Sequence, residues 1–562
     1  MNAVFDFFAH PQRSGRLRPL LFPLTVFSVF AGLSLAPLWS HAGWPLNHEF
    51  LGFAVRTQIY AQHYSFLDFL PVWSSLDNEG FGSPQPLFYH KLFYVVSASL
   101  LSFTGSMKAS LVMAILIFLV TGAFGMYYIL RALGASRDAG VAGGLSIIVA
   151  KYSVTDWLIR GALAELSAAM LVPWALLYFI RTVQEERVHP GLAVSLGLIF
   201  LGHSVICFYL VLLFSVTMLV LLAVRRIRPG ILSARSLLLP TAVFLALVGP
   251  SFLAMSVLSG DYDMGRIITE RYHPNSQFQP LGRYLWDSLW SFGESWEGFT
   301  VQIDLPPMLL ITAGLLGILL NNQTCVTTRG QRRVTLMPVL PLFLLGALAL
   351  LLQSSVSAPF YAHFPGAKFI QFPWRLLAVI TPVVIAIGLY LAEKTFPPRL
   401  AGIVLAIYLV IMVTICGAFA PIKYQRFPNL DYLPGRVNFS MADEYVPKAA
   451  PLPAPTRERV LAGAETAGCY IDHSLAIEEV KQMQFRISCV RPALLALPIF
   501  ASRLHSIAVF HHDGTSRPGT CEAAPGFPGL CGVAVPAGQS MVQVEMPSYQ
   551  AVVRWLFIGN TL

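Results

Sequence analysis

The chain of 562 residues is 55% hydrophobic and only 12% charged, whereas a soluble domain carries roughly 25% charged residues. The formal net charge is +9, yet no hydrophilic stretch gathers its basic residues into a nucleic-acid-binding patch. These values exclude an ordinary soluble domain and predict a polytopic protein surrounded by membrane lipid, with no nucleic-acid partner and an oligomeric state that composition leaves open.

The N-terminal segment is typical of a membrane anchor that is retained. Residues 1–18 contain no A-x-A-like cleavage site, and the basic run RSGRLR at 13–18 directly precedes an apolar run that begins at Pro19. Because Lys and Arg concentrate in cytoplasmic loops, we expect the N-terminus to lie in the cytoplasm.

Apolar runs of about 20 residues, the length that crosses a bilayer, predict about eleven spans. With this count every Arg-rich or Lys-rich loop falls on the cytoplasmic side. An odd number of spans places the C-terminal segment outside. The predicted spans are 19–39, 108–131, 138–153, 162–181, 189–203, 204–223, 236–257, 305–321, 336–353, 373–392 and 400–420.

The first outer loop, 40–107, is long and aromatic. Its residues 46–64 have apolar positions at helical spacing, which predicts a helix lying in the membrane interface. Residues 86–103 are apolar enough to enter the membrane partway. The other predicted outer segments are 154–161, 258–304, 354–372 and 421–562.

The composition changes after Ile422, where Pro and Gly become more frequent and short alternating runs appear. Such runs separated by turn residues predict a small β-sandwich. We therefore divide the chain into a mainly α membrane helix bundle, 1–420, and an outer β-rich domain, 421–562. The predicted strands are 484–490, 505–511, 532–538 and 540–546.

Four of the seven cysteines lie in this C-terminal segment. Four cysteines in one hydrophilic segment predict two disulfides and an oxidising compartment. Of the three possible connectivities, we choose the pairing of neighbours, Cys469 with Cys489 and Cys521 with Cys531.

The stretch from Lys151 to Leu177 carries three ionisable residues into an apolar run. The spacing of Asp156, Arg160 and Glu165 predicts that they lie near one face of a helix. Ionisable side chains in a membrane helix are costly and usually functional, so we expect this face to line a polar cavity at the outer membrane surface. Alternatively, Asp156 and Arg160 form a structural i,i+4 ion pair.

Other polar residues are predicted to lie at the same outer level. A carboxylate there can act as a general base, Arg matches the oxygens of a phosphate, and a carboxylate pair can hold a divalent metal such as Mg or Mn. Alternatively, Glu49 is an ordinary acid of the membrane interface, and Trp374 with Arg375 anchors its helix at that interface. These residues are His48, Glu49, His203, Gln371, Trp374 and Arg375.

Several motifs resemble a family of bacterial membrane proteins that bears the label "6-pyruvoyl-tetrahydropterin synthase-related". The resemblance covers nearly the whole chain. The label does not describe chemistry that this sequence supports, since a pterin synthase is a soluble zinc enzyme and no three-histidine zinc set is found here. The motifs are DWLIRGALAE at 156–165, GFGSPQPLFYHKLFY at 80–94, GHS at 202–204, QFPWRLL at 371–377 and EYVP at 444–447.

The long first outer loop with an acidic residue after the first span also resembles the C-superfamily (GT-C) of membrane glycosyltransferases. That resemblance implies a GT-C-like fold, a polyprenyl-phosphate-linked sugar donor and a catalytic carboxylate in the first loop. Where the superfamily pattern has an Asp, this chain has His48-Glu49, which keeps the carboxylate on a longer arm.

Our first hypothesis is a glycosyltransferase of the bacterial inner membrane that acts on its periplasmic face in envelope glycan or glycolipid synthesis. Glu49 is then the general base. Arg160 and Arg375 contact the donor phosphate, and Asp156 and Glu165 orient the first loop or bind a metal. The remaining substrate-binding candidates are His48, His203, Gln371 and Trp374.

The second hypothesis is a non-enzymatic membrane protein, either a transporter of lipid-linked glycan or an assembly subunit. It predicts charges distributed through the thickness of the bilayer, whereas the predicted spans place nearly all of them at the outer level. No inverted repeat of the kind found in many transporters is evident in the sequence.

Overall fold

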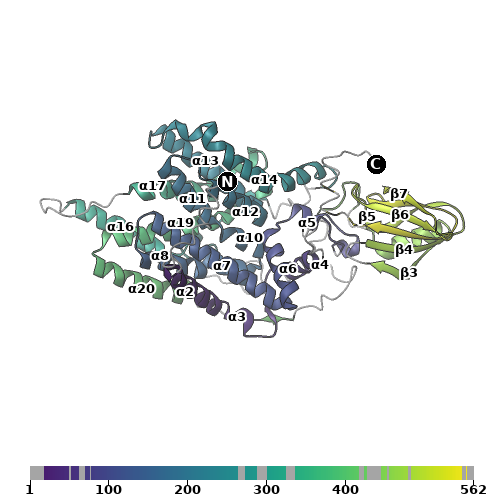
Figure 1. Ribbon diagram of the computed structural model, residues 1–562, viewed down its shortest axis with the longest axis horizontal. Coiled ribbons are helices and arrows are strands. Elements are labelled where there is room, and N and C mark those ends of the chain that lie inside the picture. The colour runs from purple at the N-terminus through teal and green to yellow at the C-terminus, as the bar shows by residue number, and fades with distance from the viewer. Residues whose placement is uncertain are drawn as a thin grey trace.

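The computed structural model describes residues 18–49, 52–62, 70–75, 77–263, 273–287, 300–323, 336–416, 423–426, 445–451, 455–478, 482–546, 548 and 552. Figure 1 shows an elongated molecule with a large helical body and a group of strands at one end of the long axis. The helices α4, α5 and α6 lie between the body and the strands.

The helical body contains helices of very different lengths. The longer ones are α2 (Arg18–Ser34), α7 (Met107–Ala132), α11 (Val172–Glu185), α13 (Ser204–Ala223), α14 (Ala234–Leu258), α16 (Leu305–Gln323), α17 (Leu340–Gln353), α19 (Leu377–Thr395) and α20 (Pro398–Cys416). The shorter ones include α4 (Gly52–Gln62), α5 (Gln85–Phe88), α6 (Leu92–Thr104), α8 (Arg137–Val149), α9 (Lys151–Val154), α10 (Leu163–Ala169), α12 (Pro190–Gly202) and α18 (Ala358–His363).

Among the described residues, five helical segments are long and apolar enough to cross a membrane. A sixth is added if Met337–Gln353 and Ser355–His363, which meet at an angle of 76°, form one broken span. Five shorter apolar helices accompany them, so the expected count of eleven spans is not confirmed by helix length. The five long segments are Met107–Ala132, Leu163–Glu185, Ser204–Ala223, Ala234–Ser256 and Pro373–Thr395.

The predicted span 138–153 corresponds to a shorter helix in the structure. Helix α8 has 13 residues and ends where Ala150 takes an extended ψ of 138°. At 1.5 Å per residue, such a helix covers roughly 20 Å, which is less than the hydrocarbon core of about 30 Å. The apolar run is continuous in sequence, but in the structure it is divided at Ala150 between α8 and α9.

The first outer loop is also more buried than expected. Helix α4 has buried residues on most of its circumference, including Phe53, Thr57 and Tyr60. It packs on α6, where Thr57 Oγ1 lies 2.8 Å from Ser97 Oγ. The expected interfacial helix is therefore a buried element of the structure.

Segments distant in sequence meet at the first outer loop. The short strand β1 (Trp44–Pro45) pairs antiparallel with β2 (Tyr424–Gln425). The backbone N–H of His48 donates to Ile159 O at 3.1 Å, and that of Lys91 donates to Leu201 O at 2.7 Å. These contacts join three segments that were predicted to lie outside, 40–107, 154–161 and 421–562, to one another and to the outer end of the predicted span 189–203.

A second set of loops meets elsewhere in the body. The carboxylate of Glu393 accepts hydrogen bonds of 2.9 and 2.7 Å from the backbone N–H of Ser136. Lys394 Nζ donates to Gly134 O at 2.6 Å. Both contacts join two loops that were predicted to be cytoplasmic, which agrees with placing these loops on the same side.

The C-terminal strands form two antiparallel sheets that share one hydrophobic cluster. In β4 the alternating residues Met483, Phe485 and Ile487 are buried, as period-two patterning requires. The sheets have the strand orders β3-β4-β10-β6-β7 and β5-β9-β8. The strands are β3 (Cys469–Glu478), β4 (Gln482–Cys489), β5 (Ala493–Phe500), β6 (Ser506–His511), β7 (Ser516–Gly519), β8 (Glu522–Ala523), β9 (Leu530–Val535) and β10 (Gly538–Glu545).

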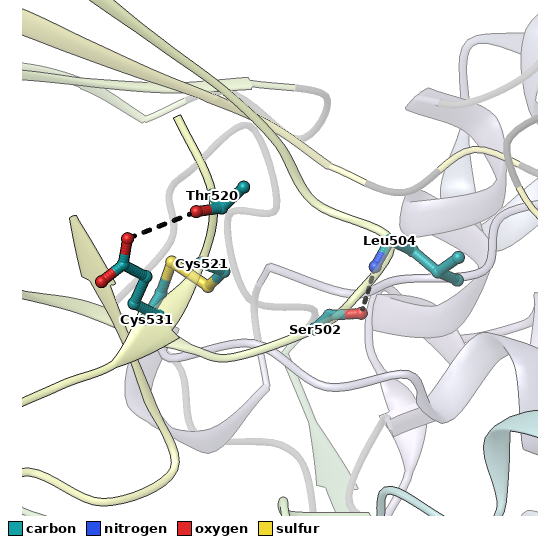
Figure 2. The surroundings of a disulfide bond; sticks show 6 residues. Ser502, Leu504, Thr520, Cys521 and Cys531 are labelled. Atoms are coloured by element: carbon teal, nitrogen blue, oxygen red, sulfur yellow. Dashed lines mark hydrogen bonds between the residues drawn. A yellow bond between two sulfur atoms is a disulfide. The ribbon is translucent and has the colours of Figure 1, made fainter. Parts of the chain in front are cut away.

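Two disulfides link these strands. Cys469 is bonded to Cys489 and Cys521 to Cys531, which is the neighbour pairing chosen from the sequence. Figure 2 shows the second bond beside Thr520, near the turn where Leu504 N donates to Ser502 Oγ. Each bond closes a short loop, which stabilises a small β-rich unit.

Alkylation tests the disulfides directly. In the denatured protein without reductant, we expect three of the seven cysteines to react, because the four bonded sulfurs are protected. After reduction all seven should react, as measured by intact mass. Reaction of five or more cysteines before reduction would contradict at least one bond. Cys469→Ala with Cys489→Ala should cost about 3 kcal/mol of stability in the strand region.

The strand region docks on the first outer loop through aromatic side chains. Phe81 packs against Phe500 with ring centroids 5.6 Å apart, and Phe500 N donates to Phe81 O at 2.8 Å. The ring of His505 meets Trp73 edge-on at 4.7 Å. The loop that carries Glu49 is therefore held from both sides, by the helical body and by the strands.

This interface predicts an acid sensitivity. Burial lowers the pKa of His505 to about 3, so the folded state binds its proton less readily than the unfolded chain does. The stability that depends on neutral His505 is complete above about pH 6.5 and is lost as the pH falls toward 3. His505→Leu should reduce the loss of stability between pH 7 and pH 5 by about 2 kcal/mol, measured by thermal denaturation in detergent.

Asp77, in the first outer loop, supplies a control because its contribution to stability should change with pH in the opposite direction to that of His505. Burial raises the pKa of Asp77 to about 6, against the hydrogen bond from Ser83 that lowers it. The stability from its protonation is present below about pH 4 and is lost as the pH rises through 6. Asp77→Asn should therefore make the protein more sensitive to acid. An identical pH profile for both variants would contradict this account.

Candidate functional site

The helical structure of the charged stretch is interrupted between Arg160 and Glu165. Residues 155–160 form a π-helical turn, and Gly161 follows with φ = 70°. A Cβ at this position would lie 2.8 Å from Asn47 Cγ, so the glycine is needed both for its positive φ and for the close approach of Asn47. π-Helical turns are frequent at functional sites. The expectation of one continuous helical face was wrong, because this break separates Arg160 from Glu165.

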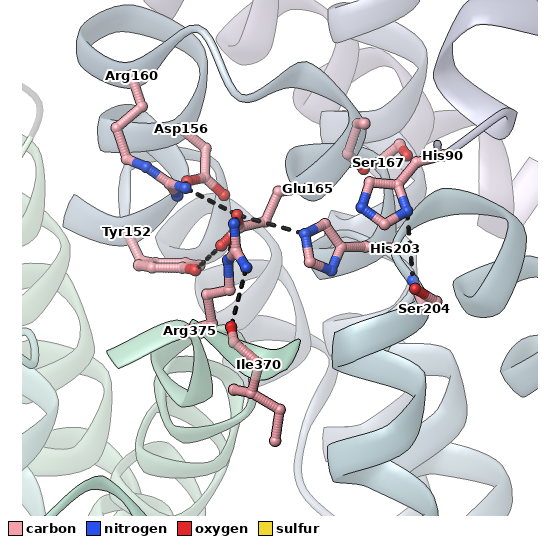
Figure 3. A network of polar contacts seen from close by, with 11 residues as sticks. His90, Tyr152, Asp156, Arg160, Glu165, Ser167, His203, Ser204, Ile370 and Arg375 are labelled. Carbon is pink, nitrogen blue, oxygen red and sulfur yellow. Dashed lines mark hydrogen bonds and ion pairs between the residues drawn. The ribbon is translucent and has the colours of Figure 1, made fainter. Parts of the chain in front are cut away.

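The break nevertheless brings the charges together around Glu165, which is buried. Its Oε2 accepts from Arg160 Nη2 at 2.8 Å and from Arg375 Nε at 3.2 Å. Its Oε1 accepts from the hydroxyl of Tyr152. Figure 3 shows these side chains converging on Glu165 from different elements. We call Tyr152, Asp156, Arg160, Glu165 and Arg375 the Glu165 network.

The two arginines of this network are held on several sides. Arg160 Nη1 donates to Asp156 Oδ1 at 2.5 Å, and its guanidinium lies 4.6 Å from the ring centroid of Trp374. Arg375 Nη1 donates to Ile370 O at 3.2 Å. With two carboxylates and two guanidiniums the network is neutral overall, as a buried cluster of charges requires.

Arg375 follows a strained turn. Gln371 has φ = 64° and ψ = −55°, and the N–H of Phe372 donates to Ile370 O at 2.7 Å. This is the geometry of a γ-turn that is rare for residues other than glycine. The turn aims Ile370 O at the guanidinium of Arg375, so the strain at Gln371 is linked to the position of the arginine.

Two histidines extend the polar region away from Glu165. His203 Nε2 lies 3.7 Å from Glu165 Oε2. The His203 ring stacks on His90 with centroids 4.0 Å apart and an interplanar angle of 28°. The N–H of Ser204 donates to His90 Nδ1 at 3.4 Å, as Figure 3 shows.

Glu49 lies on the loop next to this network but does not join it. Its backbone N–H donates to Arg160 O at 3.1 Å, which fixes the loop to the end of the π-helical turn. Its Oε2 accepts from Arg56 Nη1 at 2.9 Å. A Cβ at Gly52 would lie 3.3 Å from this Oε2, so the glycine leaves room for the ion pair. The Glu49 side chain remains 28% exposed, which makes it the accessible carboxylate of the region.

Arg56 connects Glu49 to an aromatic pocket. Its guanidinium lies 4.4 Å from the ring centroid of Tyr89, and Nη1 approaches Tyr94 OH at 3.4 Å. Arg56, Ile59 and Tyr60 share one face of α4, because they are three and four residues apart. The pocket is lined by Arg56, Ile59, Tyr60, Gln85, Pro86, Tyr89, His90 and Tyr94.

The structure thus brings together most of the residues singled out in the sequence. Asp156, Arg160, Glu165, His203 and Arg375 are in contact, Trp374 stacks on Arg160, and Gln371 shapes the adjoining turn. His48 anchors the loop through its backbone. His63 and Asp68, two further ionisable residues of the first outer loop, lie outside the described residues.

Sequence reasoning missed the residues of the pocket. Arg56, Tyr89 and His90 carry no spacing that marks a site, and Arg56 stood in a helix that was expected at the membrane surface. One signal was available. An Arg between apolar residues needs a partner, and Glu49 is the acid that precedes it by seven residues.

The carboxylates do not fit a divalent metal. Both oxygens of Glu165 are engaged by Arg160, Arg375 and Tyr152, Asp156 Oδ1 is engaged by Arg160, and Glu49 is paired with Arg56. Over the part of the chain that the structure describes, no group of three or more His, Cys, Asp or Glu side chains is placed to hold a metal ion.

Comparison with known proteins gives limited results. No protein-family model and no curated protein matches the chain, so the "6-pyruvoyl-tetrahydropterin synthase-related" label has no support from a family model. Three similar solved structures are named as glycosyl-transferring enzymes.

The arabinofuranosyltransferase AftD from Mycobacteria has 18% identity and a TM-score of 0.42, over 71% of this chain and 28% of that one. The Archaeoglobus fulgidus oligosaccharyltransferase in its apo form has 14% identity and a TM-score of 0.41, over 71% and 56%. The arabinosyltransferase EmbB from Mycobacterium smegmatis has 12% identity and a TM-score of 0.37, over 96% and 65%. The chain spans less than two thirds of each, and likeness at these TM-scores carries no argument about function.

Proposed function

We propose that this protein is a GT-C-type membrane glycosyltransferase that takes a sugar from a polyprenyl-phosphate donor at the periplasmic face of the bacterial inner membrane. The observation that carries the proposal is the geometry of Glu49. Its carboxylate is accessible, and hydrogen bonds hold both its backbone and its side chain in place. Arg160 O fixes its backbone and Arg56 its carboxylate, and Arg56 also lines the aromatic pocket.

In this proposal Glu49 acts as general base. Its carboxylate accepts the proton of an acceptor hydroxyl while the hydroxyl oxygen attacks the anomeric carbon of the donor sugar. The new bond joins that oxygen to the anomeric carbon, and the bond from the anomeric carbon to the phosphate oxygen breaks. The polyprenyl phosphate leaves with the bonding electron pair.

The Glu165 network supports the site as a scaffold. Arg160 lies between two carboxylates and the ring of Trp374, and its carbonyl oxygen receives the N–H of Glu49. Holding a base in a productive geometry contributes to catalysis because less entropy is lost in the transition state. We therefore assign the network the positioning of the first loop.

The contacts between loops support placing the first loop and the C-terminal segment on the same side of the membrane. The pairing of residues 44–45 with 424–425 requires an even number of crossings between them. The ten spans predicted between these segments meet this requirement. Asp261 forms an ion pair with Arg503, which likewise joins a predicted outer loop to the strand region.

The alternative, a transporter or assembly subunit for lipid-linked glycan, predicts buried charges spread across the bilayer. The buried ion pairs of the described helical body instead gather in the Glu165 network and its neighbours. This clustering in one network, rather than along the length of the helices, favours the glycosyltransferase.

Reconstitution in proteoliposomes tests the choice. Purified protein with a labelled polyprenyl-phosphate sugar and an envelope-glycan acceptor should release label into product, and heat-inactivated protein should not. Movement of labelled lipid-linked glycan across the bilayer without any transfer would favour the alternative and contradict the proposed reaction.

A further inference from the structure

The corner between α5 and α6, residues 87–91, is closed by a buried lysine. Helix α5 ends at Phe88, Tyr89 is extended with ψ = 170°, and Lys91 immediately precedes α6. Lys91 Nζ turns back and donates to Leu87 O at 2.8 Å and to Tyr89 O at 3.2 Å. Among the described residues neither carbonyl accepts a backbone N–H, so the lysine satisfies oxygens that the end of the helix leaves without one.

The lysine also fastens the corner to the helical body. Its backbone N–H donates to Leu201 O at 2.7 Å, near the end of α12. Lys91 is buried, and burial lowers the pKa of its ammonium from the usual 10.5 to about 8. The ammonium therefore costs stability below about pH 8, and this cost disappears as the pH rises toward 10.5. Ionisable groups with pKa values shifted in this way are frequent at functional sites.

The two ends of this corner hold Arg56. The ring centroid of Tyr89, at the end of α5, lies 4.4 Å from the guanidinium carbon. Tyr94, in the first turn of α6, places its hydroxyl 3.4 Å from Arg56 Nη1. The same Nη1 donates to Glu49 Oε2 at 2.9 Å. The guanidinium that holds Glu49 is therefore supported by two tyrosines, and the corner at Lys91 sets where these tyrosines lie relative to each other.

The backbone of α4, which carries Arg56, has a support of its own. Thr57 Oγ1 lies 2.8 Å from Ser97 Oγ on α6, away from the lysine corner. Within the described ranges, the hydrogen-bond, ion-pair and ring partners of the Arg56 guanidinium are Glu49, Tyr89 and Tyr94. A change at the corner should therefore alter the position of the guanidinium while α4 stays in place.

We propose that Lys91 is a positioning residue for Glu49: its ammonium fixes the corner between α5 and α6, and the corner holds Arg56 against the carboxylate. The inference rests on the proposed function in taking Glu49 to be the general base. The side-chain partners of Lys91 in the described structure are backbone carbonyls of the corner, so its effect on Glu49 passes through the two tyrosines and Arg56.

Kinetics in proteoliposomes test the pathway. Lys91→Met should lower kcat for sugar transfer roughly 10-fold with little change in KM for the donor, because the base remains but is held less firmly. Lys91→Arg keeps N–H donors for both carbonyls and should recover part of this loss. In an Arg56→Met background, Lys91→Met should cause no further fall in kcat, since both changes release the same carboxylate. Losses that simply add would overturn the proposal.

A second measurement needs no turnover. Full-length protein in nanodiscs is treated with a water-soluble carbodiimide and glycine ethyl ester, and the labelling rate of Glu49 is measured by peptide mass spectrometry. Lys91→Met should label about 2- to 5-fold faster, the size of change that a partly exposed ion pair supports. Tyr89→Leu removes the ring but keeps both lysine contacts, so it should show the same increase and serves if Lys91→Met folds poorly. Lys394→Met removes a comparable contact between a lysine and a carbonyl, that of Gly134, and should label like the wild type.

The outcomes separate this inference from the proposed reaction. Wild-type labelling rates in both Lys91→Met and Tyr89→Leu would overturn the positioning role, whatever the transfer activity. An equal increase in Lys394→Met would also overturn it, because the protein would then be loosened in general. Faster labelling in the two loop variants, with no sugar transfer by the wild type, would keep the positioning of Glu49 and remove the proposed reaction. Sugar transfer by the wild type, with unchanged kcat and labelling in Lys91→Met, would do the reverse.

Discussion

Glu165→Gln is expected to destabilise the helical body by about 3 kcal/mol or more, because it removes one charge from a buried cluster of paired charges. In the wild type, one carboxylate oxygen receives hydrogen bonds from both Arg160 and Arg375. Glutamine keeps the shape of the side chain but leaves a net positive charge that is desolvated. Thermal denaturation in detergent, with the yield of monodisperse protein, measures the effect.

Two further variants separate charge from packing. Asp156→Asn should cost less, since Arg160 keeps its bond to Glu165 while Asp156 has only one oxygen engaged. The double variant Glu165→Gln with Arg375→Gln restores neutrality and should be more stable than Glu165→Gln alone, a coupling that a double-mutant cycle reports. Wild-type stability of Glu165→Gln would show that the network does not hold the helices together.

Glu49→Gln is expected to reduce sugar transfer by roughly 10²- to 10⁴-fold, the usual contribution of a general base. The loss should appear in kcat, while the KM for the polyprenyl donor changes little, because glutamine retains the hydrogen bond to Arg56. Stability should change by less than about 1 kcal/mol, since a partly exposed ion pair contributes little. Labelled sugar incorporated in proteoliposomes is the readout.

Two controls accompany this variant. Glu49→Asp keeps the carboxylate on a shorter arm and should retain more activity than glutamine. Glu393→Gln removes a carboxylate that accepts only from Ser136 N and Lys394 among the described residues and should leave transfer unchanged. Unchanged transfer by Glu49→Gln would exclude Glu49 as the base. A large fall in stability would mean that its role is structural.

Much of the coarse organisation follows from local sequence patterns. Low charge and long apolar runs predict a membrane protein, and alternating runs predict strands close to β4 and β10. The choice of neighbouring cysteines as partners is confirmed for Cys469 and Cys489, because β3 and β4 are adjacent in sequence and pair with these two residues opposite each other. In each case the information is periodicity or composition within about twenty residues, which local backbone geometry expresses directly.

The site itself depended on contacts that local patterns do not encode. Arg375 and Glu165 are 210 positions apart, and their ion pair joins α10 to the 3-10 turn Pro373–Leu376 that precedes α19. Arg56 and His90 come from different segments of the first loop, and they line one pocket only after α4 packs on α6. The sequence identified the charges that were too costly to be unpaired in a membrane. The tertiary structure decided which partner each would have, because an ion pair is set by the distance between atoms and not by separation along the chain.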